Sequence, residues 1–424
     1  MSSSFVLRGD LCYSLDPQTL CAVPDGYLVC VEGRSAGVFA ALPERYSALP
    51  QLDFRGKLIV PGLVDLHAHA PQYTYRALGM DLELLEWLER HTFPAEARYA
   101  DLDFAGAAYD RFVEDLRRSP TTRACLFATS HAGATLLLME KLEESGLVTR
   151  VGKVNMDRNC SSAAREADAG ASLAETRRWL AGCGSFRRTA PILTPRFIPS
   201  CTDELLAGLG ELQRETGLPV QSHLSENLDE IAWVKELCPW SAGYADAYDR
   251  FGLLGGANCP AIMAHCVHSG PEETALLQAR GVWVAHCPES NANIASGVAP
   301  VRAFLDGGLR VGLGSDIAGG AQLSLFRAMA LAIQVSKLRW RLLDSSLAPL
   351  TIPEVFWMGT LGGGSFFGAV GSFAPGYELD ALVLDDARLS GPQPHGVEER
   401  LEQMVYLAED RDLLAKFVAG RRLF

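Results

Sequence analysis

The sequence lacks the features of several classes of protein. Its 424 residues carry a formal net charge of −13, so it has no excess of the basic residues that nucleic-acid binders use. No uncharged apolar run reaches about 18 residues, the length that a spanning helix needs. The N-terminus has no basic segment followed by an apolar core, as a signal peptide would have. We therefore expect no nucleic-acid partner, no membrane partner and a cytoplasmic location.

Cysteine is present, but not in a pattern that indicates disulfides. The eleven cysteines are an odd number and include no C-x-x-C pair, which is typical of a reducing compartment. There is also no H-x-E followed by P-C-x-x-C, the signature of zinc deaminases that act on flipped nucleobases. Hydrophobic residues make up 48% of the chain and charged residues 21%, which indicates a globular protein with a large core.

The middle of the chain alternates between buried strands and amphipathic helices. The predicted strands are residues 59–66, 124–130, 149–157, 191–197, 218–226, 260–266, 282–288 and 309–316. The predicted helices are residues 81–91, 134–145, 172–182, 203–217, 227–237, 271–281 and 298–307. Eight such units favour an α/β fold, a (β/α)8 TIM-like barrel. An open doubly wound sheet is the alternative, but it predicts a Gly-rich phosphate loop after the first strand, and none is there.

The two ends of the chain contain short strand-like segments instead of helices. We expect residues 1–58 and 366–424 to join as one small β-sandwich, and residues 59–365 to form the barrel. No local signal proves that the two ends meet, so this pairing is a hypothesis.

The stretch IVPGLVDLHAHAPQ, residues 59–72, ends a predicted strand with two histidines. Residues i and i+2 of an extended strand point to the same side, so His67 and His69 can face one point. Converging imidazoles at a strand end indicate a metal site, and two unrelated loop histidines are the alternative for so short a motif.

More polar residues follow other predicted strands, whose C-terminal ends share one rim of a barrel. His223 and Glu226 follow the fifth strand, His265 ends the sixth, and Asp316 ends the eighth. Each alone can be an ordinary hydrogen-bonding or turn residue. Together they indicate a catalytic site for one divalent metal with an open coordination position.

The predicted metal ligands are His67, His69, His223 and Asp316. A metal held there lowers the pKa of its bound water from about 16 towards 7. Glu226 can reach the same pocket without binding the metal and can shuttle protons if its pKa is raised; a helix-start residue is its alternative reading. His265 can hydrogen-bond the water or the departing group. We expect one Zn²⁺ per chain, although Fe²⁺ accepts the same ligands.

Other candidates receive weaker assignments. Lys153 lies on a predicted barrel strand and could bridge two metals if it were modified, but one metal is favoured because the strand 191–197 has no lysine. His286 ends a strand and is left without a role. The remaining histidines, interpreted as structural, are His91, His131, His268 and His395.

Several segments resemble the amidohydrolase superfamily and, within it, the guanine deaminase family. They are PGLVDLHAHAPQY, SHLSEN, MAHC, AHCPESNANIASG and GLGSDIAGG. The more specific likeness is in DLELLEWLERHTFPAE, residues 81–96, and TPRF, residues 194–197. VGKVNMDRN and the final VYLAEDRDLLAKFVAGRRLF are also similar, so the likeness covers nearly the whole chain and is weakest in the first 50 residues.

The resemblance implies a homodimeric zinc enzyme that hydrolyses guanine to xanthine and ammonia. It implies that Glu226 passes a proton from the attacking water to the ring while Asp316 helps to deprotonate that water. It also implies that Gln72, Arg196 and Phe197 contact the purine, since an amide can read a lactam edge, a guanidinium can donate to the C6 oxygen, and a phenyl ring can stack. Without the family, Arg196 would be read as a surface ion-pair residue and Phe197 as core.

Two positions depart from the family pattern. Glu289 stands where Asn is expected, which puts fine substrate choice in doubt, and Ser315 stands where Thr is usual. The nearest alternative function is the same chemistry on 8-oxoguanine, a pterin or a triazine. A non-catalytic scaffold barrel is disfavoured because every predicted ligand and Glu226 are present.

Overall fold

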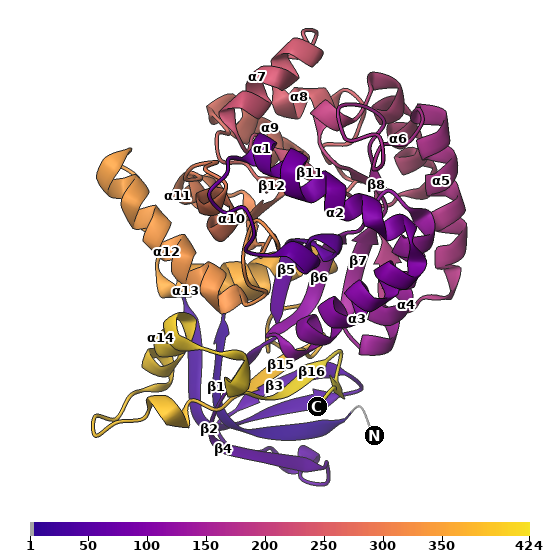
Figure 1. Cartoon of the computed structure of the whole chain (residues 1–424). Helices are drawn as coiled ribbons and strands as arrows, with labels where there is room; N and C mark the ends of the chain where they lie inside the picture. Colours follow the sequence, from indigo (N-terminus) through magenta and orange to yellow (C-terminus); the bar gives the residue numbers. More distant parts are fainter. Residues whose placement is uncertain (1–3) are drawn as a thin grey trace.

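A closed barrel forms the larger part of the molecule in the computed structural model, which describes residues 4–424 (Figure 1). Its eight parallel strands follow the order β11-β12-β13-β14-β5-β6-β7-β9. A parallel bridge between Leu193 and Val220 joins the two ends of this order. The strands are β5 Leu63–His69, β6 Thr121–Phe127, β7 Val148–Gly152, β9 Thr189–Pro191, β11 Val220–Leu224, β12 Ala261–His265, β13 Trp283–His286 and β14 Arg310–Leu313. The predicted (β/α)8 barrel is therefore confirmed.

Helices cover the outside of the barrel (Figure 1). The helices that follow barrel strands are α3 Leu102–Arg118, α4 Ala132–Ser145, α5 Ala169–Gly182, α6 Asp203–Thr216, α7 Leu228–Leu237, α8 Tyr244–Asp249, α9 Pro271–Arg280, α10 Pro288–Asn293, α11 Val301–Asp306 and α12 Leu325–Leu342. The last two helices are α13 Ile352–Trp357 and α14 Val397–Leu407. Two short parallel strands, β8 Val154–Asn155 and β10 Thr194–Pro195, extend the rim beyond β7 and β9.

The predicted helix at 81–91 begins later and is less regular than expected. It consists of α1 Leu84–Trp87, a π-helical turn Leu88–Thr92 and α2 Phe93–Ala97. Pro94 sits in the first turn of α2, where its missing N–H costs nothing. This segment lies across the barrel mouth, and its first residues lie beside the start of α7 (Figure 1).

The two ends of the chain form one seven-stranded sheet, in the order β17-β16-β15-β4-β1-β2-β3. Its strands are β1 Phe5–Ser14, β2 Leu20–Val31, β3 Arg34–Phe39, β4 Gln51–Pro61, β15 Ala381–Leu384, β16 Leu413–Val418 and β17 Arg421–Arg422. The expected union of the ends is confirmed, because β4 pairs with β1 on one side and with β15 on the other. A single residue, Gly62, separates the end of β4 from the start of β5, so this sheet leads directly into the barrel.

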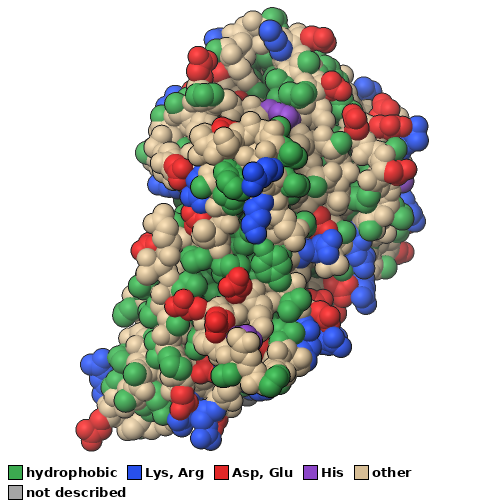
Figure 2. All heavy atoms as spheres, turned by 90° about the vertical axis from the view of Figure 1, so that its left-hand side faces the viewer, with side chains coloured by type: hydrophobic (Ala, Val, Ile, Leu, Met, Phe, Trp, Pro, Cys, Tyr) green, Lys and Arg blue, Asp and Glu red, His purple; other side chains and the backbone are tan. Residues whose placement is uncertain are grey.

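Within residues 4–424, no helix has both the length and the apolar character needed to cross a membrane. Figure 2 views the molecule from its α12 side, where basic and acidic side chains are interspersed with apolar ones. That face has no extended area of basic residues of the kind that a nucleic-acid backbone requires.

Candidate active site

The predicted site residues meet at the C-terminal rim of the barrel. His67 and His69 lie on β5, His223 on β11 and His265 at the end of β12, and Asp316 follows β14. The alternation of β5 turns both of its histidines towards the same point. Strands far apart in sequence thus deliver four imidazoles and one carboxylate to one place.

The donor atoms are close enough to share one ion. His69 Nε2 lies 3.2 Å from His223 Nε2, and His67 Nε2 lies 3.1 Å from Asp316 Oδ1. In two overlapping groups, His67–His69–His223 and His67–His265–Asp316, all donor atoms lie within 4.8 Å of one another. His67 Nε2 is buried without a hydrogen-bond partner. Buried lone pairs that face each other are unfavourable unless a cation lies between them, so this donor set fits a divalent metal.

The imidazoles are held in the neutral state that metal ligands need. Burial lowers the pKa of His67, and it lowers the pKa of His69 and His223 well below the ordinary value. The Nδ1 of His223 lies 2.6 Å from the backbone oxygen of Arg196. A proton on Nδ1 donates to that carbonyl, which leaves the Nε2 lone pair directed into the site.

Asp65 links β5 to the segment that follows β14 and carries Asp316, although the sequence alone did not single it out. Its carboxylate accepts hydrogen bonds from the hydroxyl of Ser315 at 2.5 Å and from the N–H of His67 at 3.1 Å. The N–H of Asp316 in turn donates to the carbonyl of His67 at 2.8 Å. Ser315 supplies the hydroxyl that the usual Thr would supply, so this departure from the family pattern leaves the link intact.

The two acids of the site have opposite protonation tendencies. Burial favours the neutral acid, but His67, His265 and His69 outweigh it and hold the pKa of Asp316 far below its usual range. Burial, reinforced by the charge on Asp316, raises the pKa of Glu226 to about 8. One carboxylate is therefore available as an anion, whereas the other can hold a proton near neutral pH.

Glu226 is held at the edge of the donor cluster without belonging to it. Its Oε1 accepts a hydrogen bond from Ser296 Oγ at 3.1 Å, and its Oε2 lies 3.5 Å from His265 Nε2. Glu230 accepts hydrogen bonds from the backbone N–H of Glu226 at 3.1 Å and from the hydroxyl of Tyr244 at 2.6 Å. Glu230, which no sequence pattern singled out, acts as a helix-capping residue that fixes the Glu226 backbone.

The residues matched to purine contacts line the same cavity. Gln72, Arg196 and Phe197 are 2%, 2% and 4% exposed and face the cavity that His69, His223, Glu226, His265 and Asp316 also line. Leu84, Trp87 and Leu88 from the 84–97 segment complete the wall. The cavity therefore combines an apolar cover, three polar or aromatic contacts and the donor cluster, as a site for a small flat ligand does.

Three residues that the sequence left open lie outside this cluster. The carboxylate of Glu289 accepts a hydrogen bond from Arg327 Nε at 2.7 Å. Lys153 donates to Glu166 at 2.5 Å and does not line the cavity of the donor cluster. His286 is 1% exposed with both ring nitrogens unpartnered, and burial lowers its pKa to about 3, so it stays neutral beside His265.

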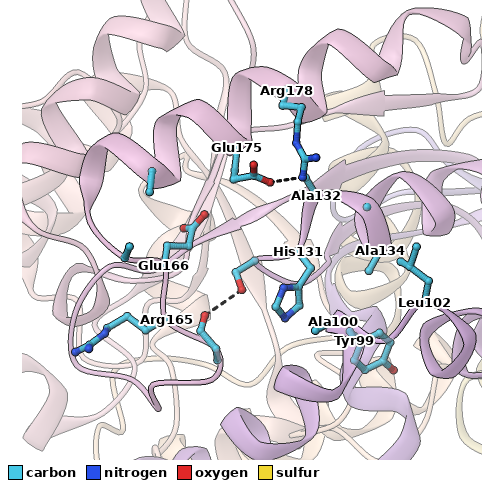
Figure 3. A pocket seen from close by; sticks show the side chains of 15 residues that line it. Tyr99, Ala100, Leu102, His131, Ala132, Ala134, Arg165, Glu166, Glu175 and Arg178 are labelled. Atoms are coloured by element: carbon cyan, nitrogen blue, oxygen red, sulfur yellow. Dashed lines mark hydrogen bonds and ion pairs between the residues drawn. The ribbon is translucent and has the colours of Figure 1, made fainter.

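A second hollow lies on the outside of the barrel, between the starts of α4 and α5 (Figure 3). Alanines supply much of its lining, and Arg178 is turned to Glu175 within it (Figure 3). Glu166 is paired with Lys153, and Ser130 donates to the carbonyl of Ala164. The buried Nε2 of His131, which also lines this hollow, has no hydrogen-bond partner among the described residues. No group of metal donors like that of the barrel rim is found around it among residues 4–424.

A closed (β/α)8 barrel with this donor cluster at its rim defines a metal-dependent hydrolase. The family model for the Amidohydrolase family matches residues 58–423, and the chain belongs to that family.

Several guanine deaminases resemble the chain over most of its length. It is 38% identical over 383 residues to the guanine deaminase of Dictyostelium discoideum, covering 88% of this chain and 84% of that protein. It is 36% identical to the guanine deaminase of Homo sapiens, covering 87% and 83%. The crystal structure of guanine deaminase from C. acetobutylicum with bound guanine superposes with a TM-score of 0.96 at 45% identity, covering 99% and 100%. The family resemblance read from the sequence is thus confirmed.

Proposed function

We propose that this protein hydrolyses guanine to xanthine and ammonia. The observation that carries the proposal is that the donor residues His69, His223 and Asp316 line the same cavity as the proposed purine contacts, which are Gln72, Arg196 and Phe197. The similarity to a guanine deaminase that holds guanine in its active site supports the same substrate. We further propose that the protein acts in the cytoplasm as a homodimer.

The proposed cofactor is one Zn²⁺ per chain, with Fe²⁺ as the alternative because it takes the same ligands. The residues that would hold it are His67, His69, His223 and Asp316. When bound, the metal supplies a water molecule whose pKa is lowered towards neutrality.

The protein side chains move the protons. The Asp316 carboxylate accepts a proton from the attacking water, and Glu226 passes a proton from the water to the purine ring. Water oxygen adds at C2 while the ring nitrogen takes up the proton from Glu226. The C2–N bond then breaks as the amine takes the proton held by Asp316 and leaves as ammonia. His265 Nε2, 3.5 Å from Glu226 and 3.7 Å from Asp316, is placed to hydrogen-bond the water or the departing amine. Glu226 suits the shuttle because its raised pKa lies near the working pH.

The purine is read by polar groups that do not require a charged ligand. Arg196 donates to the C6 oxygen, Gln72 reads the lactam edge, and Phe197 stacks on the ring. A triazine lacks the fused ring on which Phe197 would stack, 8-oxoguanine adds a carbonyl group, and a pterin has a six-membered ring in place of the imidazole. The similarity to a guanine deaminase with bound guanine supports ranking guanine first among these amino-heterocycles.

The test follows ammonia release together with the guanine-to-xanthine absorbance change in the metal-loaded enzyme. Glu226→Gln should lose about two to four orders of magnitude in kcat, because the proton shuttle is removed while the shape is kept. Glu289→Gln is the matched control and should keep normal turnover, since its carboxylate is turned to Arg327. Wild-type protein that binds one metal but leaves guanine unchanged would disprove the substrate, and protein that binds no metal would support the scaffold reading.

A further inference from the structure

A buried carboxylate outside the proposed mechanism contacts two of the three purine-reading residues. Glu96, on α2, is 1% exposed. Its Oε1 accepts a hydrogen bond from Gln72 Nε2 at 3.1 Å, and its Oε2 accepts one from Arg196 Nη1 at 2.6 Å. These three side chains, here called the Glu96 clamp, bring together residues from the barrel rim after β5, from the 84–97 segment and from the loop after β10.

The clamp fixes which end of the Gln72 amide faces which partner. A carboxylate only accepts hydrogen bonds, so Glu96 must face the amide nitrogen of Gln72. The amide oxygen of Gln72 accepts the N–H of Ala318 at 3.2 Å. Both partners demand the same orientation, and a flipped amide would place oxygen against carboxylate and nitrogen against N–H. Gln72 therefore presents one fixed pattern of donor and acceptor to a ligand.

The clamp also balances the charge of Arg196. Burial opposes that charge, but the Glu96 carboxylate beside it outweighs burial and raises the Arg196 pKa above its ordinary value. Glu96 is the ion-pair partner found for Arg196 among residues 4–424. The pair has no net charge, so Arg196 can donate hydrogen bonds to a purine without attracting an anion.

We propose that Glu96 is a specificity-determining positioning residue, which makes the cavity prefer a neutral purine over an anionic one. This inference rests on the proposed deamination of guanine. Replacing the C2 amine by a carbonyl gives xanthine, whose ring N–H is more acidic than those of guanine. When Glu96 balances the charge of Arg196, the cavity binds the neutral substrate but holds the xanthine anion weakly. The product can therefore leave.

Two substitutions separate the charge of Glu96 from its shape. In Glu96→Gln the charge of Arg196 is no longer balanced. The new amide has only one oxygen, so either Gln72 Nε2 or Arg196 Nη1 then faces an amide nitrogen. We expect the KM for guanine to rise about tenfold, because a charged hydrogen bond is lost. The inhibition constant of xanthine, measured at mildly alkaline pH, should instead fall, so that the ratio of KM to this constant rises more than tenfold.

Glu96→Asp keeps the charge but is too short to contact both partners. The KM for guanine and the inhibition constant of xanthine should rise together in this variant. Their ratio should stay within about threefold of wild type, because the shorter carboxylate still balances the charge of Arg196. Glu354→Gln is the matched control, because Glu354 is 3% exposed and pairs with Arg302 at 2.6 Å away from the cavity. It should leave KM and the xanthine constant at wild-type values.

The outcomes distinguish this inference from the proposed function. If wild type deaminates guanine but Glu96→Gln raises both constants in parallel, Glu96 has only a structural role and the inference is wrong. A ratio in Glu96→Asp that departs clearly from the wild-type ratio contradicts the inference as well, and this comparison with wild type can be made even if Glu96→Gln does not fold. If wild type does not turn over guanine at all, the proposed function fails. The inference then fails in its choice of ligands, because it assumes that the cavity discriminates guanine from xanthine.

Discussion

The residues at the barrel rim adopt backbone conformations that side chains rarely take. Ser225, His265 and Asp316 have φ values of 46°, 73° and 45°, in the left-handed region that favours glycine. Each follows or ends a barrel strand, and such strained positions are typical of functional sites, where surrounding structure holds them. The strain turns His265 and Asp316 inward at the point where their strands end.

His265 depends on a neighbour that orients its ring. Asn291 Oδ1 lies 2.8 Å from His265 Nδ1, which places the proton on Nδ1 and leaves Nε2 free towards Glu226 and Asp316. We expect Asn291→Leu to lower kcat by about 10- to 100-fold with unchanged metal content, because the ring loses its orientation. Steady-state kinetics and metal analysis test this. Asn293→Ala, which removes a hydrogen bond to Gly319 from the same helix, is the control; equal losses in both variants would contradict the prediction.

Single residues were predictable where spacing or strand position marked them. His67 and His69 share a strand face, and His223, His265 and Asp316 follow strands, so the barrel topology alone brings them together. Asp65, Glu96, Glu230 and Asn291 were not predicted from their spacing. They act through hydrogen bonds to residues distant in sequence or on another element, and only the folded structure shows such contacts.

At the scale of elements, strands were easier to predict than the segments that cover them. Buried strands often have apolar runs, as β12 and β13 do with the sequences AIMAH and WVAH. The 81–91 helix was predicted as regular because its leucines follow one stripe, but its hydrogen bonding switches to a π-helical turn at Leu88–Thr92. A π turn has no distinct side-chain pattern, and such turns recur near functional sites.

The capping of α13 predicts a pH-dependent contribution to stability. Glu354 accepts hydrogen bonds from the N–H and hydroxyl of Thr351, both at 2.8 Å, and from Arg302. Burial alone would raise the pKa of Glu354, but these donors hold it below its ordinary value. A depressed pKa stabilises the fold above the unfolded-state value, about 4.3, and this stabilisation is lost as pH falls through the folded-state pKa.

Glu354→Gln should therefore reduce the free energy of unfolding by about 1–3 kcal/mol near neutral pH. The difference from wild type should shrink below about pH 4, where the wild-type carboxylate becomes protonated. Denaturant unfolding at several pH values measures this. A difference that stays constant down to acidic pH would show that shape, not charge, accounts for the effect.

At the scale of the whole molecule, charged side chains bind the small sheet to the barrel. Arg123 on β6 donates to Asp380 at 2.6 Å and to Glu378 at 2.7 Å, both next to β15. Lys416 on β16 donates to the backbone oxygens of Arg117 and Ser119 at the end of α3. The sequence predicted that the two ends of the chain join, but these contacts between distant segments have no local signal.

Breaking the buried pair should weaken the whole fold. Arg123 and Asp380 are 3% and 0% exposed in their side chains, so Asp380→Asn leaves a buried guanidinium without its full partner. We expect a loss of about 3–5 kcal/mol in the free energy of unfolding. Glu215→Gln removes a similar pair with Arg177, but on the surface, and should cost much less because solvent screens that pair. Equal costs for the two variants, measured by denaturant unfolding, would contradict this interpretation.

The direct passage from β4 to β5 has a consequence for how the chain is made. Residues 58–61 of β4 pair with residues 381–384 of β15, which leave the ribosome only after every barrel strand. Until then, this edge of β4 exposes unpaired N–H and C=O groups, and such an edge can pair with another nascent chain. β4, which leads into the strand of His67 and His69, therefore gains β15 as its neighbour late in translation. A ribosome that stalls before β15 is made releases a polypeptide prone to aggregate.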